Sequence, residues 1–259
     1  MPQFSNHVMI IAGASSGIGA AMAVLAAAKG AQLVLAARNA TLLQEVAARC
    51  REKGAAVLVC PTDLTDASQC RRLIAETITH FGRIDTFIYN AGKGFPGWFA
   101  DVADLASIHQ EITLNYLGLV TCLHEALPYL RQTRGRIVGV ASMGALIGFP
   151  YVAGYNAAKH AMRGFLNSLR VELQPMGVSV TVAYPGAVAT EQLQQTLGKK
   201  MGTIPTLSPE RCAARILNAA YRRRRAVTPN FSGKMLLLFY PLFPRLIDRQ
   251  LYRMHQLYT

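Results

Sequence analysis

Short apolar runs alternate with helical patterns along most of this chain, and this alternation constrains the fold more than any other feature. The runs are apolar throughout rather than at every second residue, as in parallel strands buried on both faces. Helices are expected near residues 17–30, 40–53, 66–81, 102–131 and 155–174. The runs read HVMIIAG, QLVLAAR, AAVLVCPTDL, RIDTFIYNAG, GRIVGVAS and VSVTVAYPG, and a last strand is expected after Arg225. The sequence therefore predicts a doubly wound α/β fold with about seven parallel strands and helices on both faces.

Positive charge is concentrated near the C-terminus. The formal net charge is +13, and residues 211–259 contribute +9 of it through ten Lys or Arg against the single acid Asp248. This distribution indicates an anionic surface as partner rather than contact along a nucleic-acid groove, so no nucleic-acid partner is expected. Hydrophobic residues make up 51% of the chain and charged residues only 16%, so much of it must be buried or rest against an apolar surface.

Five cysteines stand at scattered positions, without a CxxC pair or a histidine at metal-ligand spacing. They are Cys50, Cys60, Cys70, Cys122 and Cys212. An odd and unpatterned set predicts a reducing compartment and no structural metal. The N-terminal MPQFSNHVM has no basic region followed by an apolar stretch, so no signal peptide is predicted and the cytoplasm is the expected location.

A glycine-rich turn, GASSGIG, follows the first expected strand and opens the first expected helix. Gly13, Gly17 and Gly19 would let the backbone turn tightly and approach a pyrophosphate, while the helix N-terminus offers free N–H groups and a favourable dipole. A plain tight turn is the alternative interpretation. The position between strand and helix favours a Rossmann-type nucleotide site.

Arg38 ends the second expected strand, about 20 residues further on, where a cofactor with a free ribose 2′-hydroxyl would usually meet Asp or Glu. A guanidinium suits a 2′-phosphate in charge and in geometry, and Ser16 could add a hydrogen bond. An exposed arginine at a strand end is the alternative. The sequence favours NADP(H) over NAD(H).

In the stretch YNAAK, Tyr155 precedes Lys159 by four residues, which places both side chains on one helical face. A free tyrosine has a pKa of about 10. A fixed positive charge nearby favours the phenolate and makes the phenol a candidate general acid. Taken alone, such a pair is most often a solvated helix face.

Taken in order along the chain, these motifs resemble those of the short-chain dehydrogenase/reductase family. GASSGIG is similar to its cofactor turn, PTDL to the segment with the acid that contacts adenine, and YNAG to its fourth-strand motif. LNYLG, VASM, YNAAK and YPGAVAT complete the pattern, which covers residues 7–225. The cofactor contacts implied by the resemblance come from Gly13, Ser15, Ser16, Gly17, Ile18, Gly19, Arg38, Asp63, Leu64, Asn90, Ala91, Gly92, Tyr155, Lys159, Pro185, Gly186, Val188 and Thr190.

The resemblance also implies a catalytic set of Asn115, Ser142, Tyr155 and Lys159. Tyr155 would protonate the substrate carbonyl oxygen as hydride arrives, and Ser142 would hydrogen-bond the same oxygen. Lys159 would lower the pKa of the phenol and hold the nicotinamide ribose. Asn115 would kink its helix locally and anchor a water that links Lys159 to solvent. Taken alone, Ser142 fits an ordinary hydroxyl at the end of a strand equally well, and Asn115 fits an ordinary polar residue of a helix.

Two positions depart from the family pattern. Ala12 stands where the family often has Thr, and Tyr89 where it often has Asn. The usual residues brace the cofactor turn and the central strands with hydrogen bonds, so a different bracing is expected here. Cofactor affinity is the property that these departures bring into question.

Substrate-side residues are expected after the fourth and fifth strands and in the loop of residues 190–207. This loop resembles the mobile segment that closes over substrate in the family. The expected lining residues are Phe95, Trp98, Met143, Phe149 and Tyr151. An aromatic and thioether lining suits a lipophilic ketone or alcohol better than a sugar, although the same residues could simply pack the core.

A basic and apolar segment ends the chain. We expect a catalytic domain of residues 1–230 and a C-terminal amphipathic extension of residues 231–259. The uncharged run from Met235 to Pro244 is too short to span a bilayer, which takes about 20 apolar residues. One interpretation is an interfacial segment in peripheral contact with a membrane. The other is a helix folded onto its own domain or onto a second subunit.

The leading hypothesis is an NADP(H)-dependent oxidoreductase that reduces a ketone or aldehyde of a hydrophobic, lipid- or steroid-like substrate. The alternative enzyme is an NAD(P)-linked alcohol or hydroxysteroid dehydrogenase that works oxidatively. A hypothesis of another class is a non-catalytic nucleotide-binding protein at membrane surfaces, against which the complete catalytic set argues. The resemblance implies a homodimer or homotetramer.

Overall fold

A parallel sheet forms the centre of the molecule in the computed structural model, which describes residues 3–191, 193–194 and 205–256. In this part of the chain, seven strands pair in the order β3-β2-β1-β4-β5-β6-β7, and every neighbouring pair is parallel. The strands are β1 (Val8–Ala12), β2 (Gln32–Ala37), β3 (Val57–Pro61), β4 (Thr86–Tyr89), β5 (Arg136–Val140), β6 (Ser179–Ala183) and β7 (Ala226–Val227). The predicted doubly wound sheet is confirmed. The strand order reverses at β1, and ligands in such sheets bind beyond the carboxyl ends of the strands at this reversal.

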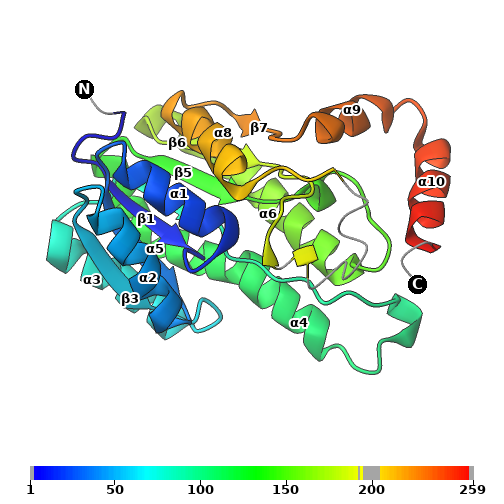
Figure 1. Ribbon diagram of the computed structural model, residues 1–259, viewed down its shortest axis with the longest axis horizontal. Helices are drawn as coiled ribbons and strands as arrows, with labels where there is room; N and C mark the ends of the chain where they lie inside the picture. The colour runs from blue at the N-terminus through cyan, green and yellow to red at the C-terminus, as the bar shows by residue number, and fades with distance from the viewer. Residues whose placement is uncertain (1–2, 192, 195–204, 257–259) are drawn as a thin grey trace.

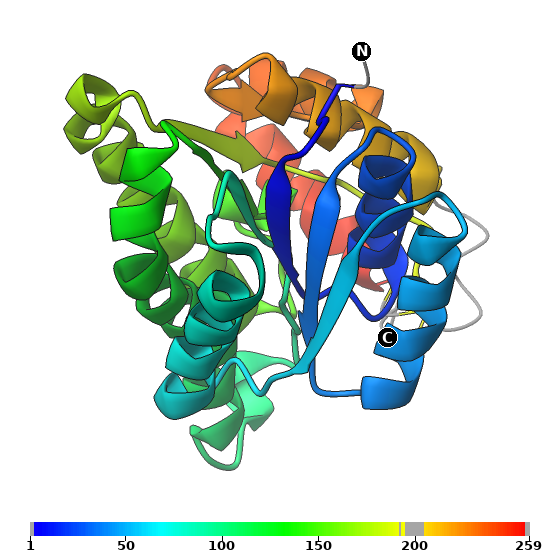
Figure 2. The ribbon, with the colours of Figure 1, turned by 90° about the vertical axis from the view of Figure 1, so that its left-hand side faces the viewer.

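Helices cover both faces of the sheet, as Figures 1 and 2 show. Within β1, Met9 and Ile11 belong to one buried apolar cluster, whereas Ile10 and Ala12 belong to the other. Alternate residues of a strand point to opposite faces, so the uninterrupted apolar run reflects two cores. The principal helices are α1 (Gly17–Ala27), α2 (Ala40–Arg51), α3 (Ala67–Phe81), α4 (Ala106–Ile112), α5 (Gly118–Gln132), α6 (Ala153–Glu172), α8 (Pro209–Tyr221), α9 (Phe231–Phe239) and α10 (Pro244–Gln256).

Several helices begin where a side chain caps their free N–H groups. The Asn39 side chain accepts a hydrogen bond from the first turn of α2, and Asp66 accepts two from the first turn of α3. Ser208 caps α8, whose first residue is Pro209. Asn, Asp and Ser side chains accept hydrogen bonds from the free N–H groups of a first turn, and proline has no N–H group that needs a partner. The expected helix starts near residues 40 and 66 therefore follow from local chemistry.

The segment predicted as one helix over residues 102–131 is interrupted. Helix α4 begins only at Ala106, a π-helical turn spans Thr113–Leu117, and α5 continues from Gly118. A π turn accommodates an extra residue and locally breaks the regular hydrogen-bond pattern. The helical segment therefore begins later than predicted, at Ala106, and the local kink expected at Asn115 takes the form of this turn.

The C-terminal segment forms two short helices, α9 and α10, which lie at the opposite end of the molecule from α3 (Figure 1). Leu236, Tyr240 and Leu251 pack against the hydrophobic core of the domain. The extension is thus partly folded onto its own domain. None of the helices in the described ranges has both the length and the apolar character needed to cross a membrane.

Candidate active site

The glycine turn after β1 is held against the turn after β4. The amide of Asn90 donates from Nδ2 to the carbonyl of Gly13 at 2.8 Å, and Gly13 has a left-handed φ of 87°. A side-chain carbon on Gly19 would overlap that same carbonyl oxygen and would lie 2.7 Å from Asn90 Nδ2. Glycine is therefore required by space at position 19 and by backbone conformation at position 13.

Helix α1 begins directly after this turn with its N-terminal donors uncapped by a side chain. Ser16 is the N-cap residue, its side chain makes no capping hydrogen bond, and the first turn contains no acid. A side-chain carbon on Gly17 would lie 3.0 Å from Thr190 Cγ2, so the segment after β6 faces the same turn. Free N–H groups at a helix start fit the phosphates of a dinucleotide.

Arg38 and Asp63 line one small cavity of about 40 Å³, together with Lys93. The Asp63 carboxylate accepts two hydrogen bonds from Thr65, through the backbone N–H at 2.9 Å and the hydroxyl at 2.7 Å. Arg38 is exposed. Lys93 was not among the predicted cofactor residues, although its position directly after YNAG was a signal that could have identified it. Two cations and one carboxylate meet where the nucleotide was expected.

Ser142, Tyr155 and Lys159 come together at the carboxyl end of β5. The Ser142 side chain hydrogen-bonds to that of Tyr155 and also accepts the backbone N–H of Gly144 at 3.1 Å. Lys159 Nζ lies 5.6 Å from the centre of the Tyr155 ring and donates to the carbonyl of Val140 at 3.1 Å. Lys159 is only 2% exposed, so the amine points into the protein rather than into solvent.

Asn115 joins this group from the π turn. Its Nδ2 donates to the carbonyls of Lys93 and Glu111, each at 2.8 Å, while Oδ1 is buried and has no hydrogen-bond partner within the described ranges. A side-chain carbon on Gly92 would overlap Asn115 Oδ1 and lie 2.9 Å from Lys159 Nζ. The unpaired amide oxygen and the amine thus approach Gly92 together, and such a polar space suits the expected water.

Burial controls the charge states of the Tyr–Lys pair. It lowers the pKa of Lys159 to about 7 and raises the pKa of Tyr155, with the Ser142 hydrogen bond opposing the rise and the negative charge of Glu111 adding to it. The expectation that Lys159 lowers the pKa of the phenol is therefore corrected for the protein without nucleotide. Desolvation disfavours the charged forms of both side chains, and it is the largest cause of each shift.

Tyr89 supplies bracing of a kind that the usual Asn would not. Its hydroxyl donates to the carbonyl of Leu114, in the π turn, at 2.6 Å. Tyr89 is fully buried, and Gly118 leaves room for it, since a side-chain carbon there would lie 2.5 Å from the hydroxyl. This departure from the family pattern connects β4 to the turn that holds Asn115.

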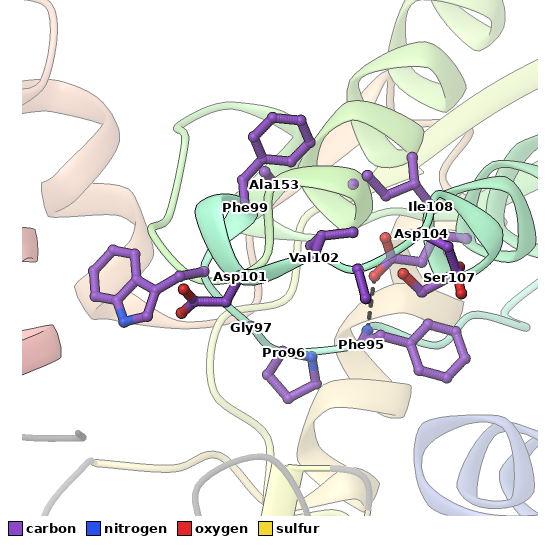
Figure 3. Close-up of a pocket in the computed structure, with 14 residues that line it drawn as sticks. Phe95, Pro96, Gly97, Phe99, Asp101, Val102, Asp104, Ser107, Ile108 and Ala153 are labelled. Atoms are coloured by element: carbon purple, nitrogen blue, oxygen red, sulfur yellow. Dashed lines mark hydrogen bonds between the residues drawn. The ribbon is translucent and has the colours of Figure 1, made fainter.

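The predicted substrate residues do not share one pocket. Phe95 and Trp98 line a cavity of about 310 Å³ beside α4 (Figure 3), whereas the other three predicted residues do not line it. Met143 and Phe149 belong to or pack against the core, and the Tyr151 ring stands edge-on to Trp98 with centroids 5.7 Å apart. Of the predicted substrate loop, residues 192 and 195–204 lie outside the described ranges.

Helix α9 lies close to Met143, one of the predicted substrate residues. A side-chain carbon on Gly233 would lie 2.9 Å from Met143 Sδ. Just before α9, Asn230 accepts the backbone N–H of Gly186 and donates to the carbonyl of Ala187, each at 2.9 Å. Asn230, a site-side residue that the motifs did not reveal, therefore links the start of the extension to the YPGAVAT segment.

Glu111 was also missed from the sequence. It is buried, its Oε1 accepts the backbone N–H of Phe95 at 2.7 Å, and burial raises its pKa. A carboxylate one helical turn before Asn115 was the available signal. In the part of the chain that the structure describes, no group of three or more His, Cys, Asp or Glu is arranged to hold a metal ion, and all five cysteines are free and buried.

Comparisons with known proteins agree with this geometry. Residues 7–201 match the family described as short chain dehydrogenase. The chain is 36% identical over 261 residues to 11-beta-hydroxysteroid dehydrogenase 1A of Arabidopsis thaliana, which covers 94% of this chain and 74% of the relative. Levodione reductase is 28% identical, with a TM-score of 0.79 and coverage of 87% of this chain and 96% of its own. An alcohol dehydrogenase from the archaeon Thermococcus sibiricus complexed with 5-hydroxy-NADP is 26% identical, with a TM-score of 0.76 and coverage of 86% and 96%.

Proposed function

Because the chain belongs to the short-chain dehydrogenase family, we propose that it is an NADP(H)-dependent reductase of a ketone or aldehyde on a hydrophobic, lipid- or steroid-like substrate. The observation that carries the proposal is the meeting of Ser142, Tyr155 and Lys159 at the carboxyl end of the sheet. Asn115 approaches the same amine from the π turn. Tyr155, Lys159 and Asn115 lie on helical backbone and Ser142 caps the short turn after β5, so little ordering is left to be done during the reaction.

In this proposal Tyr155 donates a proton to the carbonyl oxygen of the substrate while Ser142 hydrogen-bonds the same oxygen. The bound nicotinamide supplies the hydride. Lys159 has one acceptor, the Val140 carbonyl, and an ammonium has three N–H donors, so it can also hold the nicotinamide ribose hydroxyls. A water at the free oxygen of Asn115 would resupply the proton through Lys159.

NADP(H) is proposed rather than NAD(H) because Arg38 and Lys93 place two positive charges beside Asp63. The archaeal neighbour complexed with 5-hydroxy-NADP supports the same cofactor class. We expect Arg38→Ala to reduce kcat/KM with NADPH about 10- to 100-fold and to change the value with NADH much less, since a hydrogen bond to a charged group is lost. Equal losses with the two cofactors in steady-state assays would argue against a 2′-phosphate contact.

A hydrophobic substrate is proposed from the Arabidopsis relative, whose name is that of a hydroxysteroid dehydrogenase. The same name favours a second candidate, an NAD(P)-linked hydroxysteroid or alcohol dehydrogenase that works oxidatively. A panel of lipophilic ketones, their alcohols and small sugars, assayed in both directions, separates these candidates. Activity confined to sugars or polyols would contradict the proposed substrate class.

We further propose a cytoplasmic enzyme in peripheral contact with a membrane, with a catalytic domain of residues 1–230 and an extension of residues 231–259. The exposure of Phe231 and Leu242, two apolar residues of the extension, supports the membrane contact. We also propose a homodimer or homotetramer that packs through α4–α5 and α6. Leu117 and Val171 are exposed apolar residues on these elements, and light scattering tests the assembly.

Replacement of the general acid tests the function most directly. We expect Tyr155→Phe to lower turnover about 100-fold or more while NADPH still binds, because only the phenolic proton is lost. Tyr129→Phe, in α5, is the matched control. Steady-state kinetics and a cofactor-fluorescence titration check the two halves of this expectation. Undiminished turnover would show that another group donates the proton.

A further inference from the structure

The cavity beside α4 is bounded by the loop after β4, by α4 itself and by the start of α6 (Figure 3). Its volume is about 310 Å³, within the range of small-molecule sites. The large apolar residues that line it are Phe95, Pro96, Trp98, Phe99, Val102 and Ile108. Ser142 and Tyr155 are not among its lining residues, so the cavity is distinct from the proposed catalytic groups.

Glu111 is the buried charged group of this cavity, and it is 2% exposed. Oε1 accepts the backbone N–H of Phe95, whereas no donor within the described ranges bonds to Oε2. Gly154 makes room for Oε2, because a side-chain carbon there would overlap it. Burial raises the pKa of Glu111, with the Phe95 hydrogen bond opposing the rise. A buried carboxylate without a cationic partner is costly, and such groups are common at binding sites.

All charged residues that line the cavity are acids. Asp101 and Asp104 line it with Glu111, and none of its lining residues is Lys, Arg or His, although the chain carries a net charge of +13. The ion pairs of the described residues, Arg72–Glu76 and Arg83–Asp85, involve none of these acids. Lys93 lies over the ring of Phe95, with Nζ 4.8 Å from the ring centre, and lines the smaller cavity with Arg38 instead.

From this combination we propose that the cavity is a binding site for a small apolar amine. The ammonium group pairs with Glu111, and the hydrocarbon part lies against Phe95, Trp98 and their apolar neighbours. An ammonium is a compact cation with three donors and no acceptor, which matches a site that offers acceptors and negative charge. A carboxylate ligand would meet repulsion, and a plain hydrocarbon would leave the Glu111 charge unpaired.

A ligand bound in this cavity would change the pKa of Tyr155 without touching it. Tyr155 directly follows Gly154, and the negative charge of Glu111 contributes to the raised pKa of the phenol. A bound ammonium offsets that charge and so favours the ionised phenol. The binding site itself does not depend on the proposed reaction, because its occupation is measured without turnover.

Trp98 is the only tryptophan of the chain and lines the cavity, so its fluorescence reports on occupation. We expect 2-phenylethylamine, titrated near neutral pH, to bind about tenfold tighter than 2-phenylethanol, which has the same apolar part without the charge. Glu111→Gln keeps an oxygen for the Phe95 N–H but removes the charge, and it should abolish the difference between amine and alcohol. Glu45→Gln, at an exposed position of α2, is the control and should preserve it.

Equal binding of amine and alcohol to the wild-type chain would overturn the proposal, as would absence of binding by either compound. Undiminished amine binding by Glu111→Gln would do the same. The comparison on the wild-type chain needs no variant, so it decides the matter even if Glu111→Gln does not fold. Failure here would leave the reductase proposal standing, which depends on the Tyr155→Phe experiment instead.

Discussion

Lys159 is the one Lys or Arg in the described ranges whose whole residue is buried, and its surroundings decide both its charge and its use. Its pKa of about 7 means that the amine is divided between charged and neutral forms near neutrality. The anionic groups of a bound cofactor would favour the charged form. The lysine is therefore suited to gain or lose a proton during turnover, which a permanently charged surface lysine is not.

The same burial predicts a dependence of stability on pH. The pKa of Lys159 falls from an ordinary value of 10.5 to about 7 on folding, so between these pH values the unfolded chain binds more protons than the folded one. Stability without cofactor should rise with pH across this window relative to Lys159→Met, by up to about 1.4 kcal/mol per pH unit. Chemical denaturation of both proteins from pH 7 to about 10 measures the difference.

The exposed Lys53→Met variant is the control for that measurement and should follow the wild type at each pH. A constant difference between wild type and Lys159→Met across the window would mean that the amine has an ordinary pKa in the folded protein. Other groups that titrate in this range, such as the cysteines, are common to all three proteins and cancel in the comparison.

The catalytic residues could be predicted from the sequence where their spacing fixes their relative positions. Tyr155 and Lys159 lie one helical turn apart, and Ser142 follows the carboxyl end of β5, so their meeting follows from the period of the helix and the fold. The direction of the pKa shift of Tyr155 could not be predicted, because it depends on how much water reaches the phenol. Glu111 was missed because a single acid in an amphipathic helix ordinarily marks a solvated face.

Among the elements, the π turn of Thr113–Leu117 has the most specific support. Such a turn disturbs the regular backbone pairing and needs outside partners for its carbonyls. Tyr89 provides one through its bond to Leu114, and the Asn115 side chain provides another through its bond to Glu111. The π turn that positions Asn115 is thus stabilised by Tyr89, a residue of strand β4.

Removal of that support should change both stability and catalysis. Tyr89→Phe leaves the buried Leu114 carbonyl without its donor, so we expect a loss of about 1–3 kcal/mol in the free energy of unfolding. If the turn also relaxes, Asn115 shifts relative to Lys159, and the pH profile of kcat should move while the KM for cofactor stays nearly constant. Chemical denaturation and kcat measured across pH check these two effects.

Tyr116→Phe is the matched control for this variant, since Tyr116 lies in the same π turn and packs its ring against Phe165. It should leave the pH profile unchanged. A stability loss in Tyr89→Phe with an unmoved pH profile would limit Tyr89 to a structural role. Wild-type stability would show that the Leu114 carbonyl finds another donor.

The sheet could be predicted at the element scale because each strand is largely apolar, and α2, α3 and α8 each begin at a capping side chain. A kink at Asn115 was expected from the family resemblance, but its π-helical form could not be predicted, because it depends on Tyr89 and Gly118 from outside the local sequence. The direction in which the predicted substrate side chains face could not be read from the sequence. Position after a strand does not decide whether Met143 or Phe149 faces a pocket or the core.

For the whole molecule, the uneven charge and the exposed apolar residues coincide. Phe231, Leu242 and Leu246 are 74%, 65% and 65% exposed, and all belong to the C-terminal extension. Arg245, Arg249 and Arg253 follow one another at intervals of four residues in α10, so they lie along one side of the helix. A segment that combines exposed apolar side chains with a row of arginines is typical of those that lie in the surface of an anionic bilayer.

The proposed membrane contact should therefore depend on these arginines and on lipid charge. Wild-type protein should float with vesicles that contain anionic phosphatidylglycerol, and much less with phosphatidylcholine alone. Replacement of Arg245, Arg249 and Arg253 by Gln should reduce vesicle binding about 100-fold, since each basic residue near the surface contributes about 1 kcal/mol.

Replacement of three exposed arginines elsewhere (Arg49, Arg71 and Arg131) alters net charge equally and should have little effect. Equal loss in both triple variants would indicate attraction by net charge alone, and a wild type that stays unbound would refute the contact.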